Sequence, residues 1–178
     1  SIRAVWLAKY QQIKRKNASI EWVIEKSPPN MMRLASLQAC FSSNFTIALI
    51  RDPYATCASA VYRNVKNIES LSIKERKLCF QRSAQRWVKK STQIQQLIQE
   101  QHIPLIRYED LCGNTAASLT TLSLPQKLLE SINIKSELSV KDYPPQALSN
   151  KNQQQLALLQ DHDIQAISEV LQNHPKLL

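Results

Sequence analysis

Hydrophobic positions recur along the chain with two spacings, one typical of amphipathic helices and one typical of short buried strands. Six stretches have helical spacing or helical composition. We expect helices at residues 1–16, 31–41, 53–64, 73–101, 114–132 (with a break at Pro125) and 161–174. Residues 141–153 carry the prolines and polar residues of a loop. The chain is thus predicted to be rich in helices.

Three short apolar runs separate these helices and are predicted to be strands, at Ile20–Glu25, Phe45–Ile50 and Ile103–Tyr108. The second run is continuously apolar, which is typical of a central parallel strand buried on both faces. Because strands alternate with helices, we expect an α/β fold with helices packed around a central parallel sheet. The length of 178 residues fits a single domain spanning residues 1–178.

Local signals sharpen two of the helix boundaries. Pro53 suits the first turn of a helix, where its absent N–H group costs nothing. Ser72 followed three residues later by Glu75 is the spacing of a capping box, in which each side chain binds the other's backbone N–H. We therefore expect helices to begin at Pro53 and directly after Ser72.

Composition excludes several kinds of site. The chain contains a single glycine, Gly113, so a Gly-rich phosphate loop cannot be formed by these residues. The four cysteines are dispersed without a C-x-x-C pair, which predicts free thiols and no zinc site. No apolar run approaches the length of a membrane span. A phosphate site here would have to use arginine, lysine, serine and helix N-termini.

The net charge is +9, which favours an anionic partner but equally fits a solvated basic surface. In an open parallel sheet, ligands bind beyond the carboxyl ends of the strands. Lys26, Arg51 and Tyr108 stand at or directly after those ends, and we expect them to face one crevice. Arg51 presents a fork of donors suited to phosphate, and Ser59, two turns into the next helix, could add a hydroxyl.

Each of these residues also has a purely structural interpretation. Arg51 could form an ion pair with Asp52 or another carboxylate, and Ser59 could be a small residue that eases helix packing. Lys26 could be a solvated surface lysine. Tyr108 could cover the core with its hydroxyl in water, or stack on a planar ring. Position alone leaves both interpretations open.

Three segments in this order resemble the sulfotransferases that use 3′-phosphoadenosine 5′-phosphosulfate. They are residues 25–30 (EKSPPN), residues 51–59 (RDPYATCAS) and residues 103–111 (IPLIRYEDL). Residues 159–171 are similar to a C-terminal helix of the bacterial and carbohydrate-type branch. The resemblance implies a three-layer α/β/α, P-loop NTPase-like fold and a nucleotide co-substrate without a metal.

The resemblance also implies roles for four residues. Arg51 and Ser59 would bind the 3′-phosphate, Tyr108 would lie near the adenine, and Lys26 would be catalytic by stabilising the transferring sulfuryl group. The family's loop for the 5′-phosphosulfate would precede residue 1, so we expect an N-terminally truncated domain that is inactive alone. The histidine base of cytosolic members has no counterpart beside Lys26, and a glutamate from the absent part would replace it.

We therefore expect an enzyme that transfers a sulfuryl group to a hydroxyl or amine of a carbohydrate, a protein tyrosine or a small molecule. The acceptor loops would include residues 64–75 and 136–150. Two alternatives remain: a non-catalytic nucleotide-binding or scaffold remnant of this fold, and, ranked last, a basic nucleic-acid-binding domain. The sequence does not fix the cellular compartment of the protein. We favour the cytoplasm over the Golgi lumen, which would require an N-terminal anchor.

Overall fold

The sheet consists of two short parallel strands in the part of the chain that the structure describes, β1 (Ala48–Ile50) and β2 (Leu105–Arg107). Ala48, Leu49 and Ile50 pair with Leu105, Ile106 and Arg107, respectively. The structure is a computed structural model and describes residues 2–41, 43–133 and 147–177. Residues 141–146 of the predicted loop therefore lie outside the description, as do residues 136–146 of the predicted acceptor loop.

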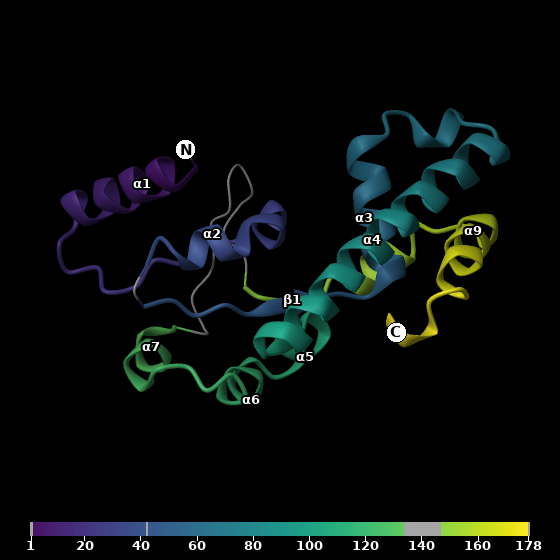
Figure 1. Cartoon of the computed structure of the whole chain (residues 1–178). Coiled ribbons are helices and arrows are strands. Elements are labelled where there is room, and N and C mark those ends of the chain that lie inside the picture. The colour runs from purple at the N-terminus through teal and green to yellow at the C-terminus, as the bar shows by residue number, and fades with distance from the viewer. Residues whose placement is uncertain (1, 42, 134–146, 178) are drawn as a thin grey trace.

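Helices make up most of the remaining structure and are arranged around the strand pair (Figure 1). They are α1 (Ile2–Lys16), α2 (Leu34–Gln38), α3 (Pro53–Asn64), α4 (Ile73–Gln101), α5 (Tyr108–Gly113), α6 (Thr115–Thr120), α7 (Gln126–Ser131), α8 (Asn152–Leu156) and α9 (Asp161–Leu171), with short 3₁₀ turns at Pro28–Arg33, Ile68–Ser70 and Pro175–Leu177. The chain is thus a helix-rich α/β protein with a small parallel sheet.

The predicted helix starts at Pro53 and after Ser72 are confirmed. The Asp52 carboxylate accepts a hydrogen bond from the Ala55 N–H at 2.7 Å, which caps α3. At α4, the Glu75 N–H donates to the Ser72 hydroxyl at 3.3 Å, and the Ser72 N–H donates to the Glu75 carboxylate at 2.9 Å. The predicted break at Pro125 is also confirmed, since it separates α6 from α7.

Other predicted elements differ from the structure. Residues 20–25 form no strand: they pair with neither β1 nor β2, and Ile24 is 80% exposed. The run before Arg51 pairs over Ala48–Ile50 alone, and Leu49 is 43% exposed, so burial on both faces is wrong. Tyr108 begins α5 instead of ending a strand. Residues 31–41 hold the end of a 3₁₀ turn and the five-residue helix α2.

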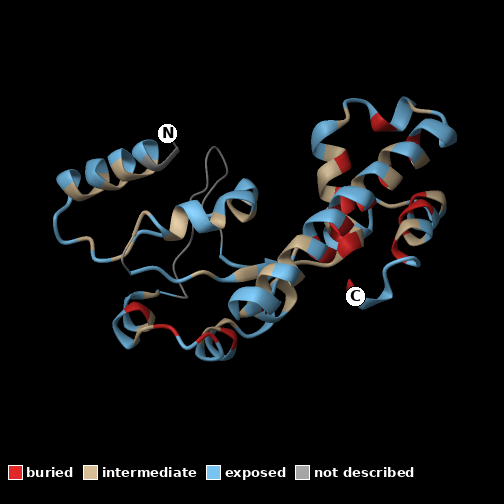
Figure 2. Ribbon diagram, in the orientation of Figure 1, coloured by how far each residue is buried: buried red, intermediate tan, exposed pale blue. Residues whose placement is uncertain are grey.

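Buried residues gather in two separate clusters. The larger cluster joins α3, α4 and α9 and includes Phe80, Trp87 and Ile167, and the smaller one surrounds Ile106, Leu122 and Leu128. Figure 2 shows these regions in red and no buried residue on α1 or α2. No side chain described before Pro53 is buried. The chain exposes 12468 Å², against about 8,800 Å² for a compact monomer of this mass.

A buried ion pair ties the larger cluster together. On α4, the Arg76 guanidinium donates from Nε and Nη2 to the Asp163 carboxylate at the start of α9, at 2.8 and 2.7 Å. Arg76 also donates to the Tyr62 hydroxyl of α3 at 2.8 Å and to the exposed Glu69 at 3.2 Å. The hydrogen bonds with Asp163 raise the pKa of Arg76, which therefore stays charged. One side chain thus links three helices.

Replacing Asp163 with alanine should strongly destabilise the protein, because Arg76 would be left as a buried charge without its main partner. The expected loss of unfolding free energy is about 3–5 kcal/mol. Urea denaturation followed by circular dichroism measures it. Glu69→Ala is the matched control, since it removes an exposed partner of the same arginine and should cost about 1 kcal/mol or less. A loss below about 1 kcal/mol for Asp163→Ala would contradict the role of the pair.

The cysteines are free thiols in the described structure, as predicted, but only Cys57 is fully buried. Burial between α3 and α4 raises the pKa of the Cys57 thiol to about 11. Since the thiolate is the reactive form, Cys57 should resist iodoacetamide at pH 8 in the native protein. Cys40, Cys79 and Cys112, which are partly exposed, should be alkylated first. Peptide mass mapping tests this order, and equal labelling of all four sites without denaturant would contradict it.

Candidate functional site

The carboxyl ends of the two strands bring Arg51 and Tyr108 together. Because Ile50 pairs with Arg107 in parallel, the residues that follow each strand leave the sheet at the same edge. The guanidinium carbon of Arg51 lies 4.5 Å from the centroid of the Tyr108 ring. This distance is that of a cation–π contact. The predicted convergence of these two side chains is therefore present in the structure.

Arg51 is held from several directions. Its Nε donates to the Oδ1 atom of Asn152 at 2.8 Å, and its backbone carbonyl accepts a hydrogen bond from the Trp87 indole on α4 at 3.2 Å. Its Nη2 atom is buried and finds no hydrogen-bond partner among the described residues. The alternative of an ion pair is not seen, since no carboxylate in the described ranges lies within ion-pair distance of Arg51.

Glu109 is the second polar centre of this edge. Its Oε1 atom accepts hydrogen bonds from the Asp52 N–H at 2.9 Å and from the Asn152 Nδ2 group at 2.7 Å. Its Oε2 atom is buried and, like Arg51 Nη2, has no partner in the described part of the chain. Burial acts to raise the pKa of Glu109, but the hydrogen bonds from Asp52 and Asn152 outweigh it and lower the pKa. Glu109 is therefore a carboxylate at neutral pH.

Tyr108 anchors the segment that carries Asn152. Its hydroxyl donates to the Ser149 carbonyl at 3.0 Å and accepts from the Lys151 N–H at 3.0 Å. Burial is the main cause that raises the pKa of Tyr108, so the phenol stays protonated. The hydroxyl therefore has two backbone partners within the described residues. Arg51 covers one face of the ring.

Ser59 and Lys26 are placed less tightly. Ser59 is partly buried near the middle of α3, the helix that starts at the same strand end. Lys26 is exposed on the extended segment before the 3₁₀ turn at Pro28–Arg33. Within the described residues, neither side chain forms a hydrogen bond with Arg51 or Tyr108. The structure thus brings two of the four predicted residues together, and the roles of Ser59 and Lys26 stay predictions.

Asn152 is the residue that sequence reasoning missed. It is only 8% exposed, begins α8, and contacts Arg51 and Glu109 across 101 and 43 residues of sequence. It lies in a stretch predicted to be a loop, with no motif or periodicity to mark it. Glu109 follows the third predicted strand, so its position at the strand end could be predicted from the sequence. Its contacts with Asp52 and Asn152 could not.

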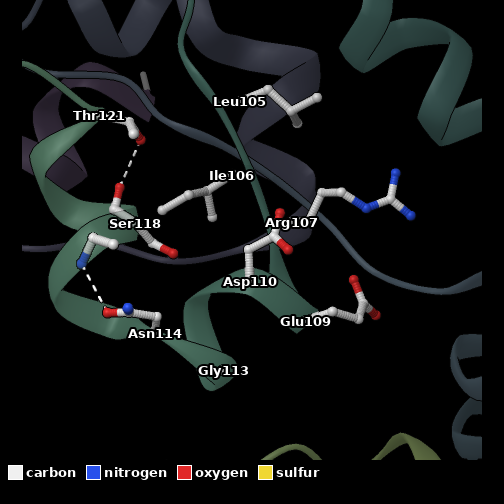
Figure 3. A pocket seen from close by; sticks show the side chains of 10 residues that line it. Leu105, Ile106, Arg107, Glu109, Asp110, Gly113, Asn114, Ser118 and Thr121 are labelled. Atoms are coloured by element: carbon white, nitrogen blue, oxygen red, sulfur yellow. Dashed lines mark hydrogen bonds between the residues drawn. The ribbon is translucent and has the colours of Figure 1, made fainter.

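An open pocket of about 510 Å³ lies beside this edge, between β2, α5 and α6 (Figure 3). Two of its polar side chains form hydrogen bonds within the neighbouring helical turns. The Asn114 side chain accepts from the Ala117 N–H at 3.0 Å, and the Thr121 hydroxyl donates to the Ser118 carbonyl at 2.8 Å. No group of three or more metal-ligating side chains occurs in the described ranges.

This edge carries charges of both signs. Arg51 and Arg107 lie at the two strand ends with the acidic residues Asp52 and Glu109, and Arg107 contributes to the lowered pKa of Glu109. Both carboxylates already accept hydrogen bonds from backbone or amide groups, whereas Arg51 retains an unused donor. An anion would therefore be recognised by directed hydrogen bonds more than by a large positive field.

Comparison with protein families identifies the class of protein to which the chain belongs. Residues 3–123 match the model of the Sulfotransferase family, which is well over half of the chain. The chain therefore belongs to the sulfotransferase family, as the three sequence segments indicated. No curated protein and no solved structure matches it. The match includes Lys26, Arg51, Ser59 and Tyr108 but ends before Asn152. No described helix has the length and apolarity to cross a membrane.

The lowered pKa of Glu109 predicts a pH dependence of stability. A carboxyl group whose pKa is lower in the folded state contributes stability above its unfolded pKa, near 4.5, and loses it as the pH falls through the folded pKa. The unfolding free energy of the protein should therefore exceed that of Glu109→Gln at neutral pH, and the difference should shrink below about pH 4.5. Urea unfolding at several pH values measures this. A difference independent of pH would contradict it.

Proposed function

We propose that this chain supplies the 3′-phosphate side of a site for 3′-phosphoadenosine 5′-phosphosulfate. The enzyme would transfer the sulfuryl group to an acceptor hydroxyl or amine. Family membership supports sulfuryl transfer as the reaction. The observation that carries the nucleotide assignment is Arg51, held at the carboxyl edge of the sheet with a guanidinium nitrogen that lacks an acceptor.

Arg51 suits a phosphate for geometric reasons. Its Nε is already bound to Asn152 and its plane lies against Tyr108, so the direction of its remaining N–H groups is set before a ligand arrives. Pre-setting a long side chain lowers the entropy lost on binding. A phosphate oxygen would provide the acceptor that Nη2 lacks, through a charge-assisted hydrogen bond.

Tyr108 and Ser59 would complete the nucleotide contacts. The Tyr108 ring would offer a surface for the adenine, while its hydroxyl fixes the ring through Ser149 and Lys151. Ser59 would add a hydroxyl donor from α3, whose capped N-terminus directly follows Arg51. In this assignment, Arg51 and Ser59 bind the phosphate and Tyr108 orients the base.

Lys26 would act on the reacting group. The acceptor oxygen or nitrogen forms a new bond to sulfur while the bond from sulfur to the 5′-phosphate oxygen breaks and its electron pair stays on the phosphate. A general base takes the acceptor's proton. The exposed ammonium of Lys26 would stabilise the charge that develops on the sulfuryl and leaving oxygens. Positioning and charge stabilisation would supply the catalysis without a metal.

The proposal extends to the fold and to the acceptor. A parallel strand pair joined through α3 and α4 is what a three-layer α/β/α, P-loop-like domain would contain at this position. The acceptor would be a carbohydrate, a protein tyrosine or a small molecule. The residues that we assign to the nucleotide would bind its 3′-phosphate and its adenine, and none is assigned to its 5′-phosphosulfate.

Comparing two nucleotides isolates the predicted 3′-phosphate contact. 3′-Phosphoadenosine 5′-phosphate and adenosine 5′-phosphate differ in the 3′-phosphate alone. Arg51→Ala should reduce the preference for 3′-phosphoadenosine 5′-phosphate by about 10- to 100-fold. This range corresponds to about 1.5–3 kcal/mol, the typical contribution of hydrogen bonds to a charged group. Ser59→Ala should reduce it by about 3- to 10-fold. Isothermal titration calorimetry measures both affinities for each variant.

Arg63→Ala is the matched control, because Arg63 is an exposed arginine near the end of the same helix. It should leave the preference unchanged. Thermal unfolding of each variant separates lost contacts from lost folding. If the wild-type protein does not prefer the 3′-phosphorylated nucleotide, or Arg51→Ala leaves the preference intact, the proposed site is wrong.

A further inference from the structure

Asn152 stands between two opposite charges that do not touch. Its Oδ1 atom accepts from Arg51 Nε at 2.8 Å, and its Nδ2 group donates to Glu109 Oε1 at 2.7 Å. An amide is suited to this position because it offers an acceptor to the guanidinium and a donor to the carboxylate at once. We propose that Asn152 is a positioning residue that keeps Arg51 from pairing with Glu109, so that the arginine stays available to an anion.

The unused atoms on either side show why a spacer matters. Arg51 Nη2 and Glu109 Oε2 are both buried, and neither has a hydrogen-bond partner in the described part of the chain. A buried donor and a buried acceptor of opposite charge gain by meeting. Without the amide between them, the guanidinium could turn onto the carboxylate and form a closed ion pair. Its charge would then be neutralised inside the protein instead of facing a ligand.

Asn152 is itself fixed in place, so it can act as a rigid spacer. Its backbone N–H donates to the Asn150 side chain at 2.8 Å, and the preceding Lys151 N–H donates to the Tyr108 hydroxyl. Helix α8, which Asn152 begins, packs against α3. Because one of these anchors, Tyr108, belongs to the site and α3 begins directly after Arg51, Asn152 keeps its position relative to Arg51.

This inference rests on the proposed function and is tested with the same nucleotide pair. Asn152→Ala should lower the preference for 3′-phosphoadenosine 5′-phosphate over adenosine 5′-phosphate by about tenfold, because Arg51 would pair with Glu109. The double variant Asn152→Ala/Glu109→Gln removes the competing charge. It should recover most of the lost preference, to within about threefold of Glu109→Gln alone. A loss of folding alone would not be repaired by a second substitution at a buried contact.

Asn173→Ala is the matched control, since Asn173 is an exposed asparagine near the C-terminus and should leave the preference unchanged. Thermal unfolding is measured for every variant. If Asn152→Ala fails to fold, Asn152→Ser replaces it. Its shorter side chain cannot bridge both partners, so it should lower the preference in the same way.

The outcomes separate the two proposals. If Arg51→Ala has no effect on the preference, the proposed function fails and the inference with it. If Arg51→Ala lowers the preference but Asn152→Ala does not, the proposed function stands and the spacer role is wrong. The spacer role is also wrong if Asn152→Ala lowers the preference and Glu109→Gln does not restore it.

Discussion

The ion pair between Arg76 and Asp163 is the constraint on which the larger core cluster of the protein depends. It is buried, it uses two guanidinium nitrogens, and it joins α4 to the start of α9 while the same arginine reaches Tyr62 on α3. A buried charge of this kind tolerates few alternative arrangements, because each misplacement leaves it without a partner. Helix α4 in turn holds Trp87 against the Arg51 carbonyl. The position of the site thus rests on the position of this helix.

The elements that the sequence predicted well are those specified by local chemistry. The starts of α3 and α4 follow from Pro53 and from the Ser72–Glu75 pair, which act within one helical turn. The strands were predicted less well because a strand needs a neighbour, and a pattern of apolar residues does not reveal whether one is present. Residues 20–25 have strand composition without such a neighbour, and the run before Arg51 pairs along a few residues only.

The same distinction applies to the site. Arg51 and Tyr108 could be predicted to converge because parallel pairing brings the residues after two strands to one edge. The contacts that orient them could not be predicted, since Asn152 meets Arg51 across 101 residues and carries no motif. Ser59 and Lys26 were predicted from the family pattern, and within the part of the chain that the structure describes no hydrogen bond joins them to the residues at the strand ends. Sequence therefore identified the principal groups, and the structure identified what holds them.

Residues 149–152 belong to the site, although they lie outside the part of the chain that matches the family. Tyr108, Glu109 and Arg51 lie within residues 3–123, yet their partners Ser149, Lys151 and Asn152 come from beyond that range. A change in chain length between the two regions need not disturb these contacts, provided that the segment returns to the same strand ends. Equivalent residues in other family members are therefore better sought by their contacts with the strand-end arginine than by their distance along the chain.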